Sequence, residues 1–332
     1  MVAVPCALCG SDRSNVFFRQ KDLTHRLTDE EFTIVRCTGC GFLFLNPRPT
    51  SSDIGRYYPT EYFGSPSPPR RFSVIRQWIR EDWHGYPAGS RPGRWRWLRK
   101  LLVWPDMVRR VLTGRVILPW VGQGRLLDVG CGAGTSTAIF KAEGWDVSAL
   151  DLNEVAVSYA RSLLGDRVQC GDFMSMHYPD RAFDVVRFSH SLEHMYDLSK
   201  VLAEARRILD DHGMLVVTVP NAGSVEAKLF GRWWFPWEIP RHLYHFDQRT
   251  ITRLLESAGL RVRQIQTGVT AAHFMTSLER VWVHRTGHAL PGRQLIEKLV
   301  VRPFCLLAGN LGYGTELTVY AMKASSPPGG AG

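Results

Sequence analysis

Short apolar runs alternate with amphipathic stretches from about position 125 to the end of the chain. Each run is rich in Val, Leu, Ile or Phe and ends near a glycine, an acid or a small polar residue, which is typical of a buried strand. The stretches between the runs have helical spacing. Strands separated by helices predict a doubly wound α/β sheet that binds its ligand where the strands end. Seven strands are predicted, at 125–129, 145–152, 167–173, 183–188, 213–219, 261–266 and 316–322.

The first predicted strand runs into a glycine-rich turn. Residues 126–134 read Leu-Leu-Asp-Val-Gly-Cys-Gly-Ala-Gly, so Asp128 is followed by glycines at positions 130, 132 and 134. Glycine adopts the unusual dihedrals of a tight strand-to-helix turn and lets a ligand approach bare backbone. A dinucleotide-binding turn has the different spacing Gly-x-Gly-x-x-Gly. The stretch predicts a ligand site, with a simple tight turn as the alternative.

Acids end the next two predicted strands. Asp151 is followed by Leu152, and Asp172 is followed by Phe173. A carboxylate at such a strand end can accept hydrogen bonds from both hydroxyls of a ribose. Asp151 is the candidate for that role, although an acid at this position, or its neighbour Asn153, also suits the start of a helix.

Together with these strands, the Asp-x-Gly-x-Gly-x-Gly spacing resembles motif I of the class I S-adenosylmethionine-dependent methyltransferases. The resemblance implies a seven-stranded, Rossmann-like sheet with S-adenosylmethionine at the strand ends. It also implies that the glycine turn faces the amino-acid carboxylate of the cofactor. The cofactor-binding residues that it implies are Asp128, Gly130, Cys131, Gly132, Gly134, Asp151, Leu152, Asp172, Phe173 and Ser189.

Four of the seven cysteines form two close pairs near the N-terminus. Cys6 and Cys9, like Cys37 and Cys40, are separated by two residues, and a glycine follows each pair. Two such pairs supply the four soft, tetrahedral ligands that zinc prefers. Because the protein fills every ligand position, we expect a structural zinc, with four free buried cysteines as the alternative. This cysteine usage and the lack of a signal-peptide pattern favour the reducing cytoplasm.

The N-terminal sequence widens the resemblance. The strings at 5–10, 35–49 and 57–63 resemble the start of a bacterial group that joins a zinc ribbon to a class I methyltransferase domain. Members often act in sugar, glycan or secondary-metabolite pathways and include deoxysugar C-methyltransferases. We therefore expect a zinc-ribbon module at 1–64, a basic linker with helices at 65–122, the methyltransferase domain at 123–324 and a disordered tail at 325–332.

Two histidine-rich clusters are candidates for removing a proton from the methyl acceptor. The first follows the fourth predicted strand, at 189–194. The second, Pro-Arg-His-Leu-Tyr-His-Phe at 240–246, resembles a stretch near the acceptor pocket in the same bacterial group. A structural hydrogen-bonding role is the alternative for every member. In order of preference, the candidates are His190 and His242, then Tyr244 and His245, with Glu193 and His194 beside them.

Two further segments are unusual. Residues 70–120 hold eleven arginines and one lysine against three acids, which is nearly the whole net charge of +10. This tryptophan-rich stretch fits a helix docked on the domain, a membrane-surface helix or an RNA-binding surface. An insertion at about 268–314, with helices expected at 272–285 and 293–307, separates the last two strands. Its apolar stretch can touch a bilayer or lipid tail, form a lid or simply pack in the core.

The sequence thus predicts methyl transfer from S-adenosylmethionine to a small molecule, namely a nucleotide- or lipid-linked sugar or glycan-pathway intermediate. RNA methylation is an alternative, although the Asn/Asp-Pro-Pro-aromatic motif of many base N-methylating enzymes does not follow the fourth strand. Quinone O-methylation is another, because Leu-Glu-His at 192–194 resembles a stretch in those enzymes. A non-catalytic protein that only binds the cofactor or a partner is the third.

Overall fold

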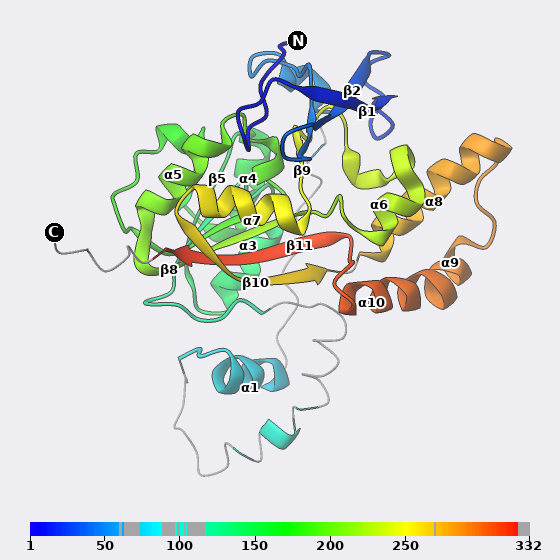
Figure 1. Ribbon diagram of the computed structural model, residues 1–332. Coiled ribbons are helices and arrows are strands. Elements are labelled where there is room, and N and C mark those ends of the chain that lie inside the picture. The colour runs from blue at the N-terminus through cyan, green and yellow to red at the C-terminus, as the bar shows by residue number, and fades with distance from the viewer. Residues whose placement is uncertain are drawn as a thin grey trace.

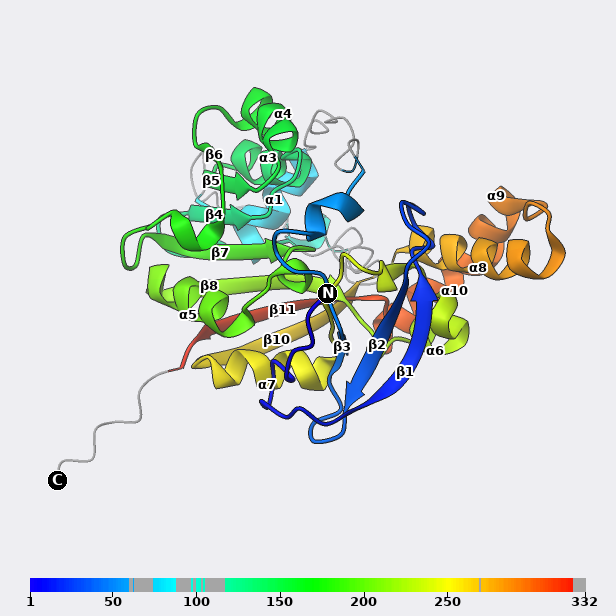
Figure 2. The same ribbon diagram turned by 90° about the horizontal axis from the view of Figure 1, so that it is seen from above.

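The computed structural model describes residues 1–59, 62, 74–87, 97, 100–102, 104, 117–268 and 270–324. A large sheet lies at the centre, and a smaller sheet built mostly from N-terminal residues packs beside it (Figures 1 and 2). Helix α1, Val74–Trp83, belongs to the basic segment 70–120. Most of that segment and the expected tail at 325–332 lie outside the described residues.

The central sheet confirms the seven predicted strands. Their bounds are β4 Arg125–Val129, β5 Asp146–Asp151, β6 Val168–Cys170, β7 Phe183–Ser189, β8 Leu209–Pro220, β10 Leu260–Gly268 and β11 Glu316–Lys323. The strand order is β10-β11-β8-β7-β4-β5-β6. Strands β6, β5, β4, β7 and β8 pair in parallel, whereas β11 is antiparallel to β8 and β10. The chain changes direction across the sheet beside β4, where ligands bind in doubly wound sheets.

Helices cover both faces of this sheet, because its strands alternate their side chains between two apolar faces. Along β5, Ala149 packs with the helices α3 (135–142) and α4 (154–164), and Leu150 belongs to the core that contains α5 (198–208) and α7 (248–257). Asp197 and Asp247 accept backbone N–H bonds at the starts of α5 and α7, which fixes where these helices begin. The helices are α3 Thr135–Ala142, α4 Glu154–Leu164, α5 Leu198–Ile208 and α7 Gln248–Ser257.

The smaller sheet joins the N-terminal module to the central domain. It consists of β1 Ser14–Lys21, β2 Glu31–Cys37, β3 Leu43–Leu45 and β9 Tyr244–His245, in that order. Strand β9 comes from the chain beyond β8 and pairs with β3, so that Phe44 lies opposite Tyr244. Phe32 and Phe44 of the module share one buried cluster with Phe246 and the sheet core. The module and the domain therefore fold around a common core.

The chain between β10 and β11 forms helices close to the two predicted ones. They are α8 Ala271–Thr286, α9 Arg293–Ile296, a π-helical turn Glu297–Val301 and α10 Arg302–Asn310. Together with α6, Val225–Phe230, they project from one side of the molecule (Figures 1 and 2). Among the described residues, no helix has both the length and the hydropathy needed to cross a bilayer.

Candidate active site

The glycine turn between β4 and α3 has a left-handed backbone. The φ angle is 76° at Gly130, 54° at Gly132 and 75° at Gly134, values that residues with a Cβ rarely adopt. A Cβ on Gly130 would lie 2.5 Å from the Cβ of Ser191. Ser191 also donates a 2.6 Å hydrogen bond from Oγ to the Val129 carbonyl. The turn therefore requires glycine and lies directly against the segment that follows β7.

Asp151 ends β5 with its carboxylate against this turn. Oδ2 accepts the N–H of Gly132 at 2.8 Å, and Oδ1 accepts the N–H of Asn153 at 2.9 Å. Burial raises the pKa of Asp151, although both N–H groups oppose the rise. Each oxygen has a further lone pair that a ribose hydroxyl can use. Leu152 is 70% exposed beside it and offers an apolar surface to an adenine ring.

Asp128 lies beneath the turn. Its side chain is fully buried, and Oδ2 accepts hydrogen bonds from Thr137 Oγ1 at 2.5 Å and from Arg187 Nη1 at 2.7 Å. Its other oxygen has no hydrogen bond within the described part of the chain. These contacts make Asp128 a brace between β4, β7 and the start of α3, so that it positions the turn from below.

The remaining predicted cofactor residues border the same edge of the sheet. Asp172 is exposed and accepts the backbone N–H of the residue two positions on, at 2.8 Å. Phe173 is only 2% exposed and packs its ring against Phe188. Cys131 is buried within the turn, and Ser189 ends β7 with partial exposure. In this arrangement, Phe173 can offer a ligand its backbone more readily than its ring.

Glu193 lies buried between two histidines just beyond β7. Its Oε1 is 3.6 Å from His190 Nδ1 and 4.0 Å from His242 Nε2. Neither carboxylate oxygen has a hydrogen bond to another described residue. His190 has the left-handed φ of 53°, and its Nε2 lies 3.7 Å from Glu316 Oε1. A buried carboxylate of this kind needs a nearby cation or proton donor.

The loop before β9 brings His242 into this cluster. His242 Nδ1 donates to the Pro236 carbonyl at 2.9 Å, which leaves the lone pair on Nε2, 3.5 Å from Glu238 Oε2. The rings of His194 and His242 meet edge to face with centroids 4.7 Å apart. Glu193, His194 and His242 present ligand atoms within 4.8 Å of one another, so the cluster also has the composition to hold a cation.

His190 and His242 carry different charges at neutral pH. Burial lowers the pKa of His190, but Glu193 and Glu316 outweigh burial and raise the pKa to about 9. Burial lowers the pKa of His242 to about 4, against the charges of Glu238 and Glu193. His190 is therefore the cation that faces Glu193. His242 is a neutral imidazole able to accept a proton.

Tyr244 and His245 lie in strand β9, and their contacts are with the small sheet and its surroundings. The Tyr244 hydroxyl donates to the Tyr196 carbonyl at 3.0 Å and accepts a 2.6 Å bond from Arg48. His245 is buried with its ring against Trp237. The structure therefore gives these two candidates places in the packing between module and domain.

Sequence reasoning missed the residues that reach the cluster from the N-terminal module. Tyr58 directs its hydroxyl to His194 Nδ1 at 3.0 Å, and Tyr62 donates to Glu238 Oε1 at 2.8 Å. Arg241, next to His242, pairs with Asp22 through two bonds of 2.9 Å. Residues 57–62 carry only a family resemblance in the sequence, and nothing local in the sequence connects Asp22 to Arg241.

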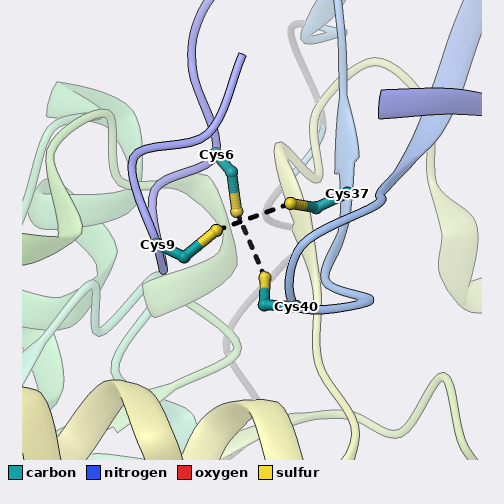
Figure 3. Close-up of side chains that lie close together, drawn as sticks. All are labelled: Cys6, Cys9, Cys37 and Cys40. Carbon is teal, nitrogen blue, oxygen red and sulfur yellow. Dashed lines mark hydrogen bonds between the residues drawn. The ribbon is translucent and has the colours of Figure 1, made fainter. Parts of the chain in front are cut away.

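The four N-terminal cysteines converge on one point, as Figure 3 shows. Their sulfurs lie within 4.8 Å of one another, and the pairs Cys6–Cys40 and Cys9–Cys37 are each 3.5 Å apart. Tetrahedral zinc with bonds of about 2.3 Å separates its thiolates by roughly 3.8 Å. None of the four forms a disulfide. Burial raises the pKa of the Cys6 and Cys40 thiols, whereas hydrogen bonds from the Cys40 backbone, the Cys9 side chain and the Gly39 backbone outweigh burial and lower the pKa of Cys37 to about 7.

The chain is similar to known proteins over part of its length. Residues 102–265 match the family described as "Methyltransferase domain". Over these residues, which are about half of the chain, the sequence is similar to methyltransferase domains. The Mesorhizobium loti S-adenosylmethionine-dependent methyltransferase structure aligns over 66% of this chain and 96% of its own length, with 18% identity and a TM-score of 0.42.

Two curated relatives resemble part of this domain. A demethylmenaquinone methyltransferase of Clavibacter sepedonicus is 35% identical over 121 residues, which cover 35% of this chain and 49% of that protein. The 27-O-demethylrifamycin SV methyltransferase of Amycolatopsis mediterranei is 37% identical over 131 residues, or 35% of this chain and 48% of that protein. The chain thus spans about half the length of these relatives.

Proposed function

We propose that this protein transfers a methyl group from S-adenosylmethionine to a small-molecule acceptor. The observation that carries the proposal is the close contact between the glycine turn and the segment after β7. Gly130 lies against Ser191, which directly follows His190 and comes two residues before Glu193. A cofactor held at the turn would therefore lie beside groups that can manage a proton, and proximity of this kind supplies much of the rate of a displacement reaction.

The residues present fit S-adenosylmethionine. Asp151 keeps free lone pairs for the ribose hydroxyls, and the exposed Leu152 supplies an apolar surface for the adenine. The glycine turn opens α3 with backbone N–H groups, which suit a carboxylate. When bound, the cofactor would supply an electrophilic sulfonium methyl group. Asp128 does not need to touch it, because its bonds to Thr137 and Arg187 hold the turn in place.

His242 is the proposed base. The acceptor would lose a proton as it receives the methyl group that the bound cofactor would supply. His242 Nε2 carries a lone pair at neutral pH and would take that proton. Glu238 and Glu193, 3.5 and 4.0 Å away, would stabilise the imidazolium that forms. His190, already cationic, would instead orient Glu193 and donate a hydrogen bond to the acceptor.

The proposed acceptor is a sugar or glycan-pathway intermediate linked to a nucleotide or lipid. The resemblance of the N-terminal module supports this class. A second candidate is a quinone-type acceptor, favoured by the demethylmenaquinone in the name of the Clavibacter relative and by Leu-Glu-His at 192–194. A neutral histidine between carboxylates suits proton removal from either acceptor.

We also propose that the four cysteines hold a structural zinc ion. The sulfur spacing and the converging side chains support it (Figure 3). The ion would have no open coordination position when four thiolates bind it, so its task would be to stabilise the small sheet.

Calorimetry and a transfer assay test the proposal. The full chain should bind S-adenosylmethionine, and Asp151→Ala should weaken binding by about tenfold or more, since hydrogen bonds to charged groups contribute about 1.5–3 kcal/mol each. Asp166→Ala, which removes an exposed acid away from the turn, is the control. Labelled methyl from the cofactor should then enter small molecules of a fractionated bacterial extract. Absence of S-adenosylmethionine binding would refute the proposal. Label that ribonuclease releases would show that the acceptor is RNA and not a small molecule.

A further inference from the structure

One helical face of the insertion exposes a line of large apolar side chains. Leu295, Leu299, Leu307 and Leu311 are 63%, 62%, 62% and 63% exposed. They recur every four residues or a multiple of four along α9, the π-helical turn and α10. Residues four apart lie on the same side of a helix, so Leu295 and Leu299 share one side and Leu307 and Leu311 share one side. Soluble surfaces rarely gather large apolar residues in one contiguous patch unless it binds something.

The opposite face of the same helices is well packed. Val301 and Cys305 are buried, at 0% and 1% exposed, and form a small core with Met275 of α8. Phe274 and Phe304 meet edge to face at 5.3 Å between ring centroids. The insertion therefore has its own core, and the leucine line is a second apolar face that this core does not need.

Basic side chains surround the leucine line. Lys298 and Arg302 lie between the leucines in sequence. Arg293 precedes them and pairs with Glu279, and Arg285 is at the end of α8. Between residues 283 and 313 the one acid is Glu297, which is bonded to Arg302. The face thus combines apolar anchors with net positive charge, the composition of helices that lie in the headgroup region of anionic membranes.

We propose that α9 and α10 dock on an anionic lipid surface, with the leucines entering the apolar boundary and the basic residues contacting headgroups. A second copy of the chain fits less well, because a two-fold contact would place like charges of the two basic rims together. No described helix can span the bilayer, so the docking is peripheral.

Docking would bring the proposed acceptor side close to the membrane. Helix α8 of the same insertion places His273 Nδ1 3.8 Å from Glu316 Oε1, and Glu316 also lies beside His190. The His273 ring packs against Phe235 at 5.3 Å between centroids. Insofar as the methyl-transfer proposal holds, an acceptor with a lipid tail would enter from this side. The lipid binding itself is measured without turnover and is independent of that proposal.

Co-sedimentation with vesicles tests the inference. The full chain should bind vesicles of phosphatidylcholine mixed with phosphatidylglycerol much more strongly than phosphatidylcholine alone, and high salt should weaken binding. Leu299→Ser combined with Leu307→Ser should reduce binding by at least about tenfold, given the free energy of burying two leucines. Lys298→Glu should weaken binding to the anionic vesicles only. The matched control is Val16→Ser, because Val16 is 58% exposed and lies on β1 of the smaller sheet, away from the insertion.

Two results of the vesicle experiment would overturn the lipid-docking proposal. Equal sedimentation of the double serine variant and the wild type would overturn the proposal, as would no binding by the wild-type chain. Sedimentation velocity on the same proteins detects the competing occupant: a dimer that the double serine substitution dissociates would assign the face to self-association. Unchanged S-adenosylmethionine affinity and circular dichroism would show that the variants remain folded.

Discussion

Asp22→Ala removes one half of a buried ion pair between the N-terminal module and the loop that carries His242. The two carboxylate oxygens of Asp22 each accept a 2.9 Å hydrogen bond from the Arg241 guanidinium, and both side chains are fully buried. Burial raises the pKa of Asp22, but Arg241 outweighs burial and holds the pKa below its ordinary value. The carboxylate is therefore charged at neutral pH, and its loss leaves a buried cation.

The contacts that Arg241 retains set the expected magnitude. Breaking a buried ion pair by removing one partner costs about 3–5 kcal/mol. In the variant, Arg241 would still donate to the Tyr57 carbonyl at 2.8 Å and lie 3.3 Å from Glu238 Oε1. Because the guanidinium keeps these partners, we expect a loss of about 3 kcal/mol, at the lower end of that range.

Urea unfolding followed by tryptophan fluorescence measures this loss. Asp29→Ala is the matched control, because the Lys21–Asp29 pair has a similar 2.9 Å contact but side chains 56% and 100% exposed. Such a pair contributes less than about 1 kcal/mol. Asp22→Asn retains the shape and separates charge from packing. If Asp22→Ala destabilises the protein no more than the control, the pair does not fasten the module to the domain.

Three further results are expected. Cys40→Ser should abolish zinc binding and lower methyl transfer more than S-adenosylmethionine affinity, because β9, next to His242, pairs with the cysteine module. Metal analysis of the wild type should give one zinc per chain. A second metal would assign the Glu193 cluster as a metal site. Burial raises the pKa of Glu226 to about 7, so the wild type loses stability as the pH rises from about 4.5 through 7. Glu226→Gln should therefore stabilise the protein by on the order of 3 kcal/mol at pH 8 and little at pH 4. Urea unfolding at both pH values measures this difference. With His242 as the base, transfer should be flat between pH 6 and 8; a tenfold rise per pH unit toward 9 would assign that role to His190 instead.

The proposed cofactor half of the site could be predicted from sequence because its residues are local. Asp128, the three glycines and Asp151 lie at strand ends that the apolar pattern already marks. The pattern fixes which end of a strand a residue occupies, so the positions follow from topology alone. The sequence could not show that Asp128 points beneath the turn. Its partner Arg187 is 59 positions away on a strand predicted only as apolar.

The acceptor half was only partly accessible, because its contacts are tertiary. Strand β9 is two residues long, too short for any periodicity, and pairs with a strand about 200 positions earlier. The Asp22–Arg241 pair joins residues 219 positions apart. The sequence favoured His190 and His242 over His245 as site residues. Only the fold shows that the first two face Glu193, whereas the ring of His245 packs on Trp237.

This division has a consequence for specificity. The turn that fits the cofactor is built within one strand-helix-strand unit, whereas the groups around His242 come from distant segments. Tyr58 and Asp22 belong to the N-terminal module, Glu193 follows β7, and His273 belongs to the inserted helix α8. Changes in the module or the insertion can therefore reshape the acceptor side while Asp151 and the glycines keep their geometry. We therefore expect the N-terminal module and the inserted helices to determine which acceptor binds, and the central sheet to determine which cofactor binds.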